Sequence, residues 1–88
     1  MKFGIFSIYD TKAAAHLPPF FLPTRGLAIR AFTDCVNDAS HQFSKHPEDY
    51  TLFLVGNFDD VSGELDMPNV RENLGHGSQF VVQSIIEE

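Results

Sequence analysis

The sequence predicts an α+β fold in two layers, a small sheet of about four strands with one main α-helix packed on it. Residues 2–9 and 50–58 are rich in aromatic, β-branched and aliphatic side chains, as in strands that are buried on both faces. Between them, residues 25–36 have apolar side chains at the spacing of one helical face. The 88-residue chain has room for a single domain, residues 1–88.

The first predicted strand, Lys2 to Tyr9, is apolar on both faces, which indicates a central place in the sheet. Asp10 to Lys12 form a polar turn, and Ala13 to His16 form either a short return strand or a single helical turn. Three prolines follow within six residues. Since proline fits neither a helix interior nor a central strand, we expect residues 18–23 to be an extended, rigid loop.

The predicted helix begins behind Thr24, whose hydroxyl is well placed to accept from an amide of the first turn. Asn37 and Asp38 favour turns and end it. A polar connection follows over residues 39–49, with Phe43 tucked back as an anchor. The expected apolar face of the helix contains Leu27, Ala28, Ala31, Phe32, Cys35 and Val36.

The second half of the chain supplies the remaining strands. The strand at 50–58 is followed by an Asp-rich turn to Gly63 and a short hairpin partner at Glu64 to Met67. Residues 68–77 are expected to be a loop or one weak helical turn. Residues 78–86, rich in valine and isoleucine, are expected to form the last strand.

Charge is distributed unevenly along the chain, whose net charge is −6. Residues 1–46 hold five cations against three acids, whereas residues 47–88 hold one cation against nine acids. The two parts therefore carry +2 and −8. This pattern excludes a uniformly basic nucleic-acid binder and leaves a bipolar surface with one mildly basic face.

A single cysteine excludes an internal disulfide and fits a reducing cytoplasm. The first residues are too polar for a signal peptide, and no apolar run approaches the roughly 20 residues of a membrane span. We therefore expect a soluble, intracellular protein that has no membrane partner.

Motifs for catalysis or metal binding are not recognisable. His41 and His46 are five apart, and no Cys-x-x-Cys or His-x-x-x-His pair exists. The acidic segment 59–64 resembles half of a calcium loop, but the position that needs a bidentate Glu holds Arg71. We expect no catalytic residue, no metal site and no cofactor, hence a protein that is not an enzyme.

Binding is the function class that remains. Four cations flank the proline-rich segment with its two phenylalanines, and single-stranded nucleic acid is held by such a mixture of phosphate-contacting cations and stacking rings. The alternative is purely structural, with the rings in the core and the arginines on an ordinary solvated helix face. The candidate DNA-binding residues are Lys12, Arg25, Arg30, Lys45, Phe20 and Phe21.

Several short motifs also occur in a specific order, among them Asp10-Thr11-Lys12-Ala13, Leu17-Pro18-Pro19-Phe20, Ala28-x-Arg30-Ala31-Phe32, Val36-Asn37-Asp38, Lys45-His46-Pro47-Glu48-Asp49-Tyr50-Thr51-Leu52 and Gly56-x-Phe58-Asp59-Asp60. Over about residues 1–66 this series resembles the small non-structural protein of the gokushoviruses, microviruses with small circular single-stranded DNA genomes. The resemblance implies a counterpart of the microvirus protein that shifts replication toward single-stranded synthesis coupled to packaging. It implies action in the host bacterial cytoplasm and transfers no catalytic residue.

The sequence leaves several binding partners to consider. Genome DNA or the phage replication complex is the first, and a protein-only module that binds a replication factor without DNA contact is the alternative. The acidic half, including Glu48, Asp49, Asp59 and Asp60, either is simply solvated or meets a basic protein by charge complementarity. A homodimer is expected to pair sheets across a two-fold axis, with the last strand as the edge.

Overall fold

Two long strands, β1 (Lys2–Asp10) and β4 (Tyr50–Asp59), form the centre of the molecule in the computed structural model, which describes residues 1–82. They pair antiparallel from Lys2 opposite Asp59 to Asp10 opposite Tyr50, with one irregularity in the register after Ile5. Both predicted strands and their central position are thereby confirmed, and each extends one residue further than predicted.

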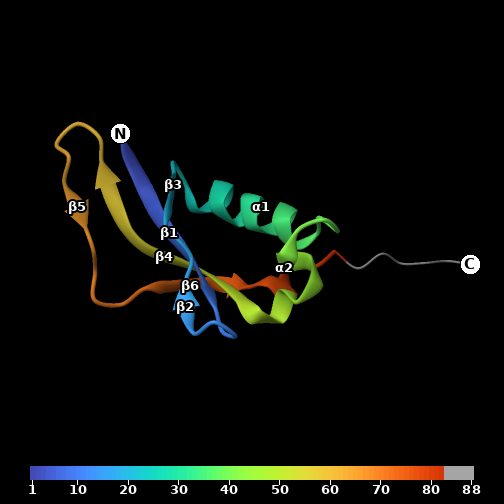
Figure 1. Ribbon diagram of the computed structural model, residues 1–88. Helices are drawn as coiled ribbons and strands as arrows, with labels where there is room; N and C mark the ends of the chain where they lie inside the picture. The colour runs from blue at the N-terminus through green and yellow to red at the C-terminus, as the bar shows by residue number, and fades with distance from the viewer. Residues whose placement is uncertain (83–88) are drawn as a thin grey trace, which may run out of the picture.

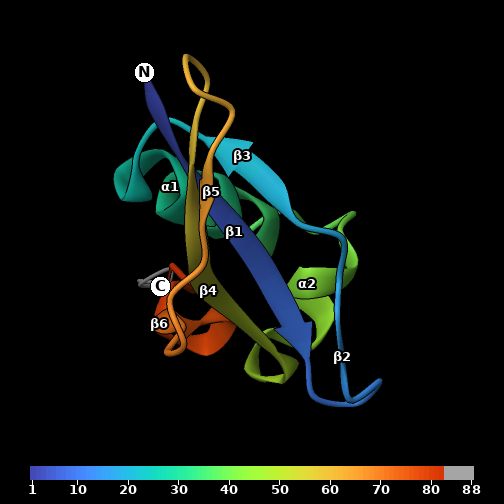
Figure 2. The ribbon, with the colours of Figure 1, turned by 90° about the vertical axis from the view of Figure 1, so that its left-hand side faces the viewer.

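Four short strands extend this central pair. On one side β2 (Ala15–His16) and β3 (Phe20–Leu22) pair with β1, and on the other β5 (Leu65–Asp66) and β6 (Glu72–His76) pair with β4. All pairings are antiparallel, and Figure 2 shows β1 and β4 crossing the middle of the sheet. The sheet has six strands rather than about four, because strands of two or three residues are too short to leave a periodic pattern in the sequence.

Three predicted segments differ in the structure. Residues 18–23 are not a loop throughout, since β3 forms on the outer side of β1 and the prolines lie beside it rather than in it. Residues 68–77 contain β6 in place of a loop or weak helix. The predicted last strand is wrong over its described part, where residues 77–79 form a 3₁₀ turn, η2 (Gly77–Gln79), and residues 83–86 lie outside the described residues.

The second layer is α1 (Arg25–Val36), which covers one face of the sheet (Figure 1). Its N-cap is confirmed, since the Thr24 hydroxyl accepts a hydrogen bond from the Leu27 amide at 3.1 Å. The helix buries a narrow stripe of Ala28, Phe32 and Val36. Leu27 and Ala31, which were expected on this face, are exposed, because a single stripe at i, i+4 and i+8 is enough to contact so narrow a sheet.

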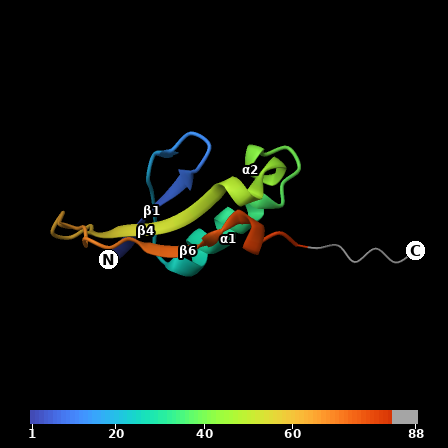
Figure 3. The ribbon, with the colours of Figure 1, turned by 90° about the horizontal axis from the view of Figure 1, so that it is seen from below.

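A short second helix, α2 (Gln42–Lys45), closes one end of the core and leads through a 3₁₀ turn, η1 (Pro47–Asp49), into β4. Phe43 is buried as predicted, and its ring packs against Tyr50 with centroids 4.4 Å apart. Seen from below, β6 runs beside β4 while α1 and α2 lie toward the same end of the molecule (Figure 3). The core consists mainly of Phe6, Ile8, Ala28, Phe32, Val36, Phe43, Tyr50 and Leu52.

The face of the sheet opposite α1 carries no helix within residues 1–82, and it faces the viewer in Figure 2. Side chains alternate along a strand, so Ser7 and Tyr9 of β1 and Phe53 of β4 point to this open face while Phe6, Ile8 and Leu52 point to the helix. None of the described helices has the length and apolar composition needed to cross a bilayer. The open face is the surface on which functional side chains gather.

Candidate functional site

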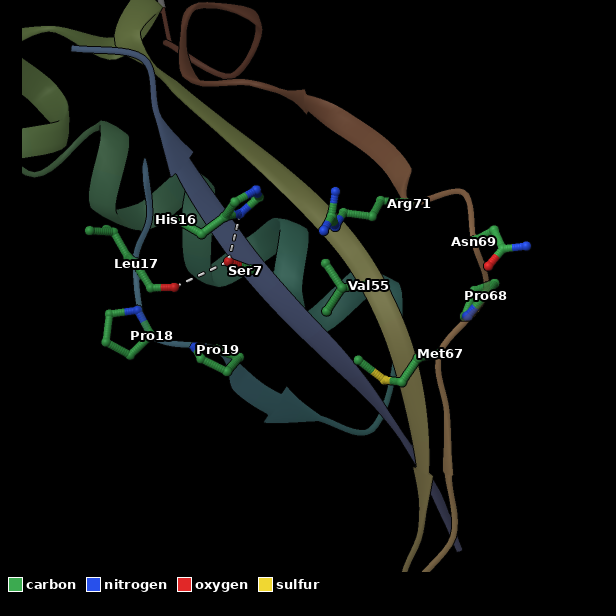
Figure 4. Close-up of a pocket in the computed structure, with 10 residues that line it drawn as sticks. All are labelled: Ser7, His16, Leu17, Pro18, Pro19, Val55, Met67, Pro68, Asn69 and Arg71. Carbon is green, nitrogen blue, oxygen red and sulfur yellow. Dashed lines mark hydrogen bonds between the residues drawn. The ribbon is translucent and has the colours of Figure 1, made fainter. Parts of the chain in front are cut away.

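A groove of about 540 Å³ crosses the open face of the sheet. One wall is the chain from His16 to Pro19, and the other is the segment from Met67 to Arg71 between β5 and β6. Ser7 and Val55, from the two central strands, lie at its floor (Figure 4). Its volume is within the range of about 300–1,000 Å³ in which small-molecule ligand pockets fall.

Ser7 and His16 are joined at the floor of this groove. The Ser7 hydroxyl lies 3.0 Å from His16 Nδ1 and donates to the Leu17 carbonyl at 3.1 Å (Figure 4). Since its one hydrogen is given to Leu17, Ser7 accepts from an Nδ1–H tautomer of His16, which is an assignment from the hydrogen-bond network. Ser7 is only 5% exposed, so the pair ties the chain after β2 to β1 instead of presenting an activated nucleophile.

Arg71 supplies the positive charge of the groove. It is exposed, it makes no ion pair with any residue of the described chain, and in Figure 4 it and His16 point toward each other from the two sides. His16, which lines the groove with Arg71, lies against two half-buried rings of the same face, with its centroid 4.9 Å from Tyr9 and 5.8 Å from Phe53. A guanidinium across a groove from an exposed ring can hold a phosphate while the ring contacts a flat, apolar group.

The four predicted cations do not gather at this groove. Lys12 follows β1 and Lys45 ends α2, and both lie at the end of the sheet where the Thr11 amide donates to the Asp49 carbonyl at 2.9 Å. Arg30 is exposed on α1, on the other side of the sheet from the groove.

Arg25 begins α1, and its guanidinium donates to the Glu72 carboxylate of β6 at 2.5 Å. This hydrogen bond and the charge of Glu72 raise the pKa of Arg25. The arginine thus has a partner within the fold. A contact between DNA and these four cations stays a prediction, and it would involve more than one surface of the molecule.

Phe20 and Phe21 point to opposite faces of the sheet, because neighbouring residues of a strand alternate. Phe20 packs on the core, where its ring lies 5.8 Å from that of Phe6. Phe21 is 49% exposed on the open face, and its ring lies 5.8 Å from that of Phe58. Of the two, only Phe21 shares a face with the groove.

The acidic residues form two groups at opposite ends of β4. Glu48 and Asp49 precede the strand, whereas Asp59, Glu64 and Asp66 lie at its far end. Ten residues of strand separate the groups by about 30 Å. Apart from Glu72, which pairs with Arg25, the described acids of this half therefore form two separate groups with the cationic groove between them along the strand.

Comparison with known proteins gives one match, to the family model described as Phage ORF5 protein, over residues 3–80. The chain belongs to the Phage ORF5 protein family. Neither the curated proteins nor the solved structures contain a match to it. The matched range runs from Phe3 in β1 to the residue after η2, and it therefore includes every residue that lines the groove.

Two further sets of reactive side chains lie outside the groove, and their surroundings favour structural roles. Burial, together with the charges of Asp38 and Asp34, raises the pKa of the Cys35 thiol, which makes it a poor nucleophile. His46, Glu48 and Asp49 bring ligand atoms within 4.8 Å of one another, but they lie in and beside the η1 turn, and His46 and Glu48 are exposed. Three such groups fall short of the oxygen-rich or closed sets that hold most ions.

Sequence reasoning missed Arg71, His16, Tyr9 and Phe53 as neighbours. One signal was present, since Arg71 is the single cation of residues 47–88. His16 of β2 shares the groove with Arg71 and lies against Tyr9 of β1 and Phe53 of β4, and only the pairing of these strands brings the side chains together.

Proposed function

We propose that this phage protein is a non-catalytic accessory protein that associates with the viral genome or its replication complex and promotes single-stranded DNA synthesis and packaging. The observation that supports this best is the groove on the open sheet face, which Arg71 and His16 line together and where the His16 ring lies against Tyr9 and Phe53. Following the resemblance to gokushovirus proteins, we propose that it acts in the cytoplasm of a host bacterium infected by a microvirus.

The chemistry of the groove suits a single strand better than a duplex. A duplex hides the flat faces of its bases, whereas a single strand can lay them on aromatic side chains while a guanidinium contacts the backbone. Acidic patches at both ends of β4 repel phosphates, so affinity would be modest and strongly dependent on salt. Weak, reversible binding suits a protein that must leave the genome as it is packaged.

The test is fluorescence anisotropy with labelled single-stranded and duplex DNA across a salt series. We expect single strands to bind more tightly, and we expect Arg71→Ala to weaken binding and reduce the salt slope by about 0.7, the value for one phosphate contact on a single strand. Phe53→Leu should weaken binding with little effect on the slope, because it removes stacking and no charge.

Arg30→Ala is the matched control, because it removes the same charge from the helical side of the molecule. If Arg30→Ala and Lys12→Ala weaken binding while Arg71→Ala does not, DNA binds at the cations predicted from sequence and not at the groove. Absence of binding at low salt would reject the genome-associated function.

A second candidate function is a protein-only module that binds a phage or host replication factor without DNA contact. It is favoured by exposed apolar side chains on the sheet, with Phe21 49% and Leu65 60% exposed. A protein-only module should be retained by a replication factor in a pull-down from infected cells treated with nuclease, and Arg71→Ala should leave that retention unchanged.

A further inference from the structure

The groove on the open face contains no negative charge of its own. Among the described residues that line it there is no aspartate or glutamate, although the sequence has 12 acidic residues. Arg71 is exposed in the groove and makes no ion pair within residues 1–82. The positive charge of Arg71 is therefore available to an anion, and His16 is the side chain that points toward it from the opposite wall (Figure 4).

His16 is held in place through one of its two ring nitrogens. Nδ1 lies 3.0 Å from the Ser7 hydroxyl, and the hydrogen of that hydroxyl is donated to the Leu17 carbonyl. The neutral imidazole therefore carries its hydrogen on Nδ1 and has a free lone pair on Nε2. Nε2 makes no hydrogen bond within residues 1–82. A proton can thus be added at Nε2 while the bond between His16 and Ser7 stays intact.

Few other ionisable groups surround His16. Tyr9 and Arg71 are of residue types that keep one charge state between about pH 5 and pH 8. The carboxylate of Asp10, at the end of β1, accepts two backbone amides of the following turn at 3.0 and 3.3 Å. Strand register places a second imidazole, His76, on this face, and its side chain accepts a backbone amide of η2. Of these two histidines only His16 lines the groove, so it is the residue there whose charge can change near neutral pH.

We infer that Arg71 and His16 together bind one backbone phosphate of a single DNA strand, and that His16 binds it as the imidazolium, after taking up a proton from solvent at Nε2. This inference rests on the proposed association with the genome, and it assigns a second phosphate-binding residue to the same groove. In the free protein the charge of Arg71 disfavours a second cation opposite it. A phosphate between the two side chains reverses this preference, because an anion favours the charged form of imidazole and accepts a hydrogen bond from its Nε2–H.

Fluorescence anisotropy with a labelled oligothymidine at constant salt, between about pH 8 and pH 6, tests the inference. The dissociation constant should fall with pH by up to about tenfold per pH unit, the limit for uptake of one proton. Isothermal titration calorimetry in buffers that differ in ionisation enthalpy should show proton uptake by the unaltered protein, so this measurement requires no variant. His16→Gln keeps an amide that can donate to Ser7, and it should bind weakly and equally at both pH values.

His76→Asn is the matched control, since it removes the other imidazole of this face and keeps an oxygen that can accept the η2 amide. It should retain the pH dependence of binding. Binding that is equally tight at both pH values, without proton uptake, would overturn the inference and leave the proposed function standing, whereas absence of binding at any pH would reject both.

Two further outcomes would overturn the inference. The first is loss of the pH dependence in His76→Asn and its retention in His16→Gln, which would assign the proton to the other histidine. The second is equal proton uptake with inorganic phosphate and with oligothymidine at the same concentration of phosphate groups, which would assign the groove to free phosphate.

Discussion

Gly77 lies where two turns meet, and it has no room for a side chain. A Cβ atom there would collide with the carbonyl oxygen of Pro47 and lie 3.1 Å from its carbonyl carbon. Because the neighbour is backbone, relief requires η1 and η2 to move apart. The absence of a side chain at this glycine thus allows the turn before β4 to pack directly against the turn after β6.

Gly77→Ala should lower the free energy of unfolding by about 1–3 kcal/mol, the usual cost of overpacking. Gly26→Ala is the control, because a Cβ at this exposed position of α1 meets nothing closer than the Thr24 hydroxyl at 3.8 Å. Alanine favours helix over glycine, so Gly26→Ala should raise stability by up to about 1 kcal/mol. Urea denaturation of both variants measures the contrast, and equal effects would contradict the assigned contact.

Two exposed carboxylates give stability a dependence on pH. Asp38 accepts from the Ser40 hydroxyl at 2.7 Å and Asp59 accepts from the Val61 amide at 2.9 Å, and these hydrogen bonds lower the pKa of both groups. A carboxyl group with a lowered folded pKa stabilises the fold above its unfolded pKa, and this contribution is lost as pH falls through the folded value.

The melting temperature should therefore fall between about pH 5 and pH 2, and the double variant Asp38→Asn, Asp59→Asn should show a flatter profile because asparagine does not titrate there. Thermal unfolding followed by circular dichroism at a series of pH values measures this. Parallel profiles for the two proteins would show that other groups cause the acid sensitivity.

At the scale of elements, α1 depends on local signals that the sequence contains. Thr24 caps its first turn and Asn37 ends it, with the Asn37 amide donating to the Thr33 carbonyl at 3.1 Å. The Asn37 side chain also donates to the Phe80 carbonyl at 3.0 Å, and it accepts from the Val82 amide at 2.8 Å. The end of α1 thereby anchors the segment after η2, which explains why that segment leaves the sheet.

Thr24→Ala should cost about 1 kcal/mol of stability, because it leaves an amide of the first turn without its acceptor. Thr24→Ser keeps the hydroxyl and should lose only a few tenths of that amount. Denaturant midpoints of the two variants provide the comparison. Equal loss in both would mean that the methyl group of Thr24, and not its capping bond, is what matters.

The molecule as a whole relies on a small core. Nine hydrophobic residues of the described chain are buried, and the ring of Phe32 lies at the junction of the layers, 5.8 Å from Phe43 and 5.9 Å from Phe80. Domains of this size have unfolding free energies of about 5–15 kcal/mol. One large core side chain therefore represents a considerable share of the total.

Phe32→Ala should cost about 3–5 kcal/mol, through lost burial and the cavity that remains. Phe21→Ala removes the same atoms from a half-exposed position outside the core, so its cost should be clearly smaller. Urea unfolding followed by far-UV circular dichroism compares the two. A similar loss in both variants would contradict the distinction between the buried core and the exposed side of the sheet.

In the molecule as a whole, charged side chains are distributed unevenly along β4. The two acidic groups occupy its ends, and Arg71 lies between them over the open face. The proposed DNA groove therefore has an acidic group beyond each of its ends.

The sequence by itself determined the two long strands, the capped helix between them and the burial of Phe43, because periodicity, capping and apolar runs are local properties. Only the tertiary structure decided the four short strands, the place of β6 and the course of residues 77–82 away from the sheet, since these depend on contacts with distant residues. The same holds for function. The predicted cations were visible in the sequence, but the neighbours of His16 come from strands far apart in the chain, and it is their pairing that makes the groove.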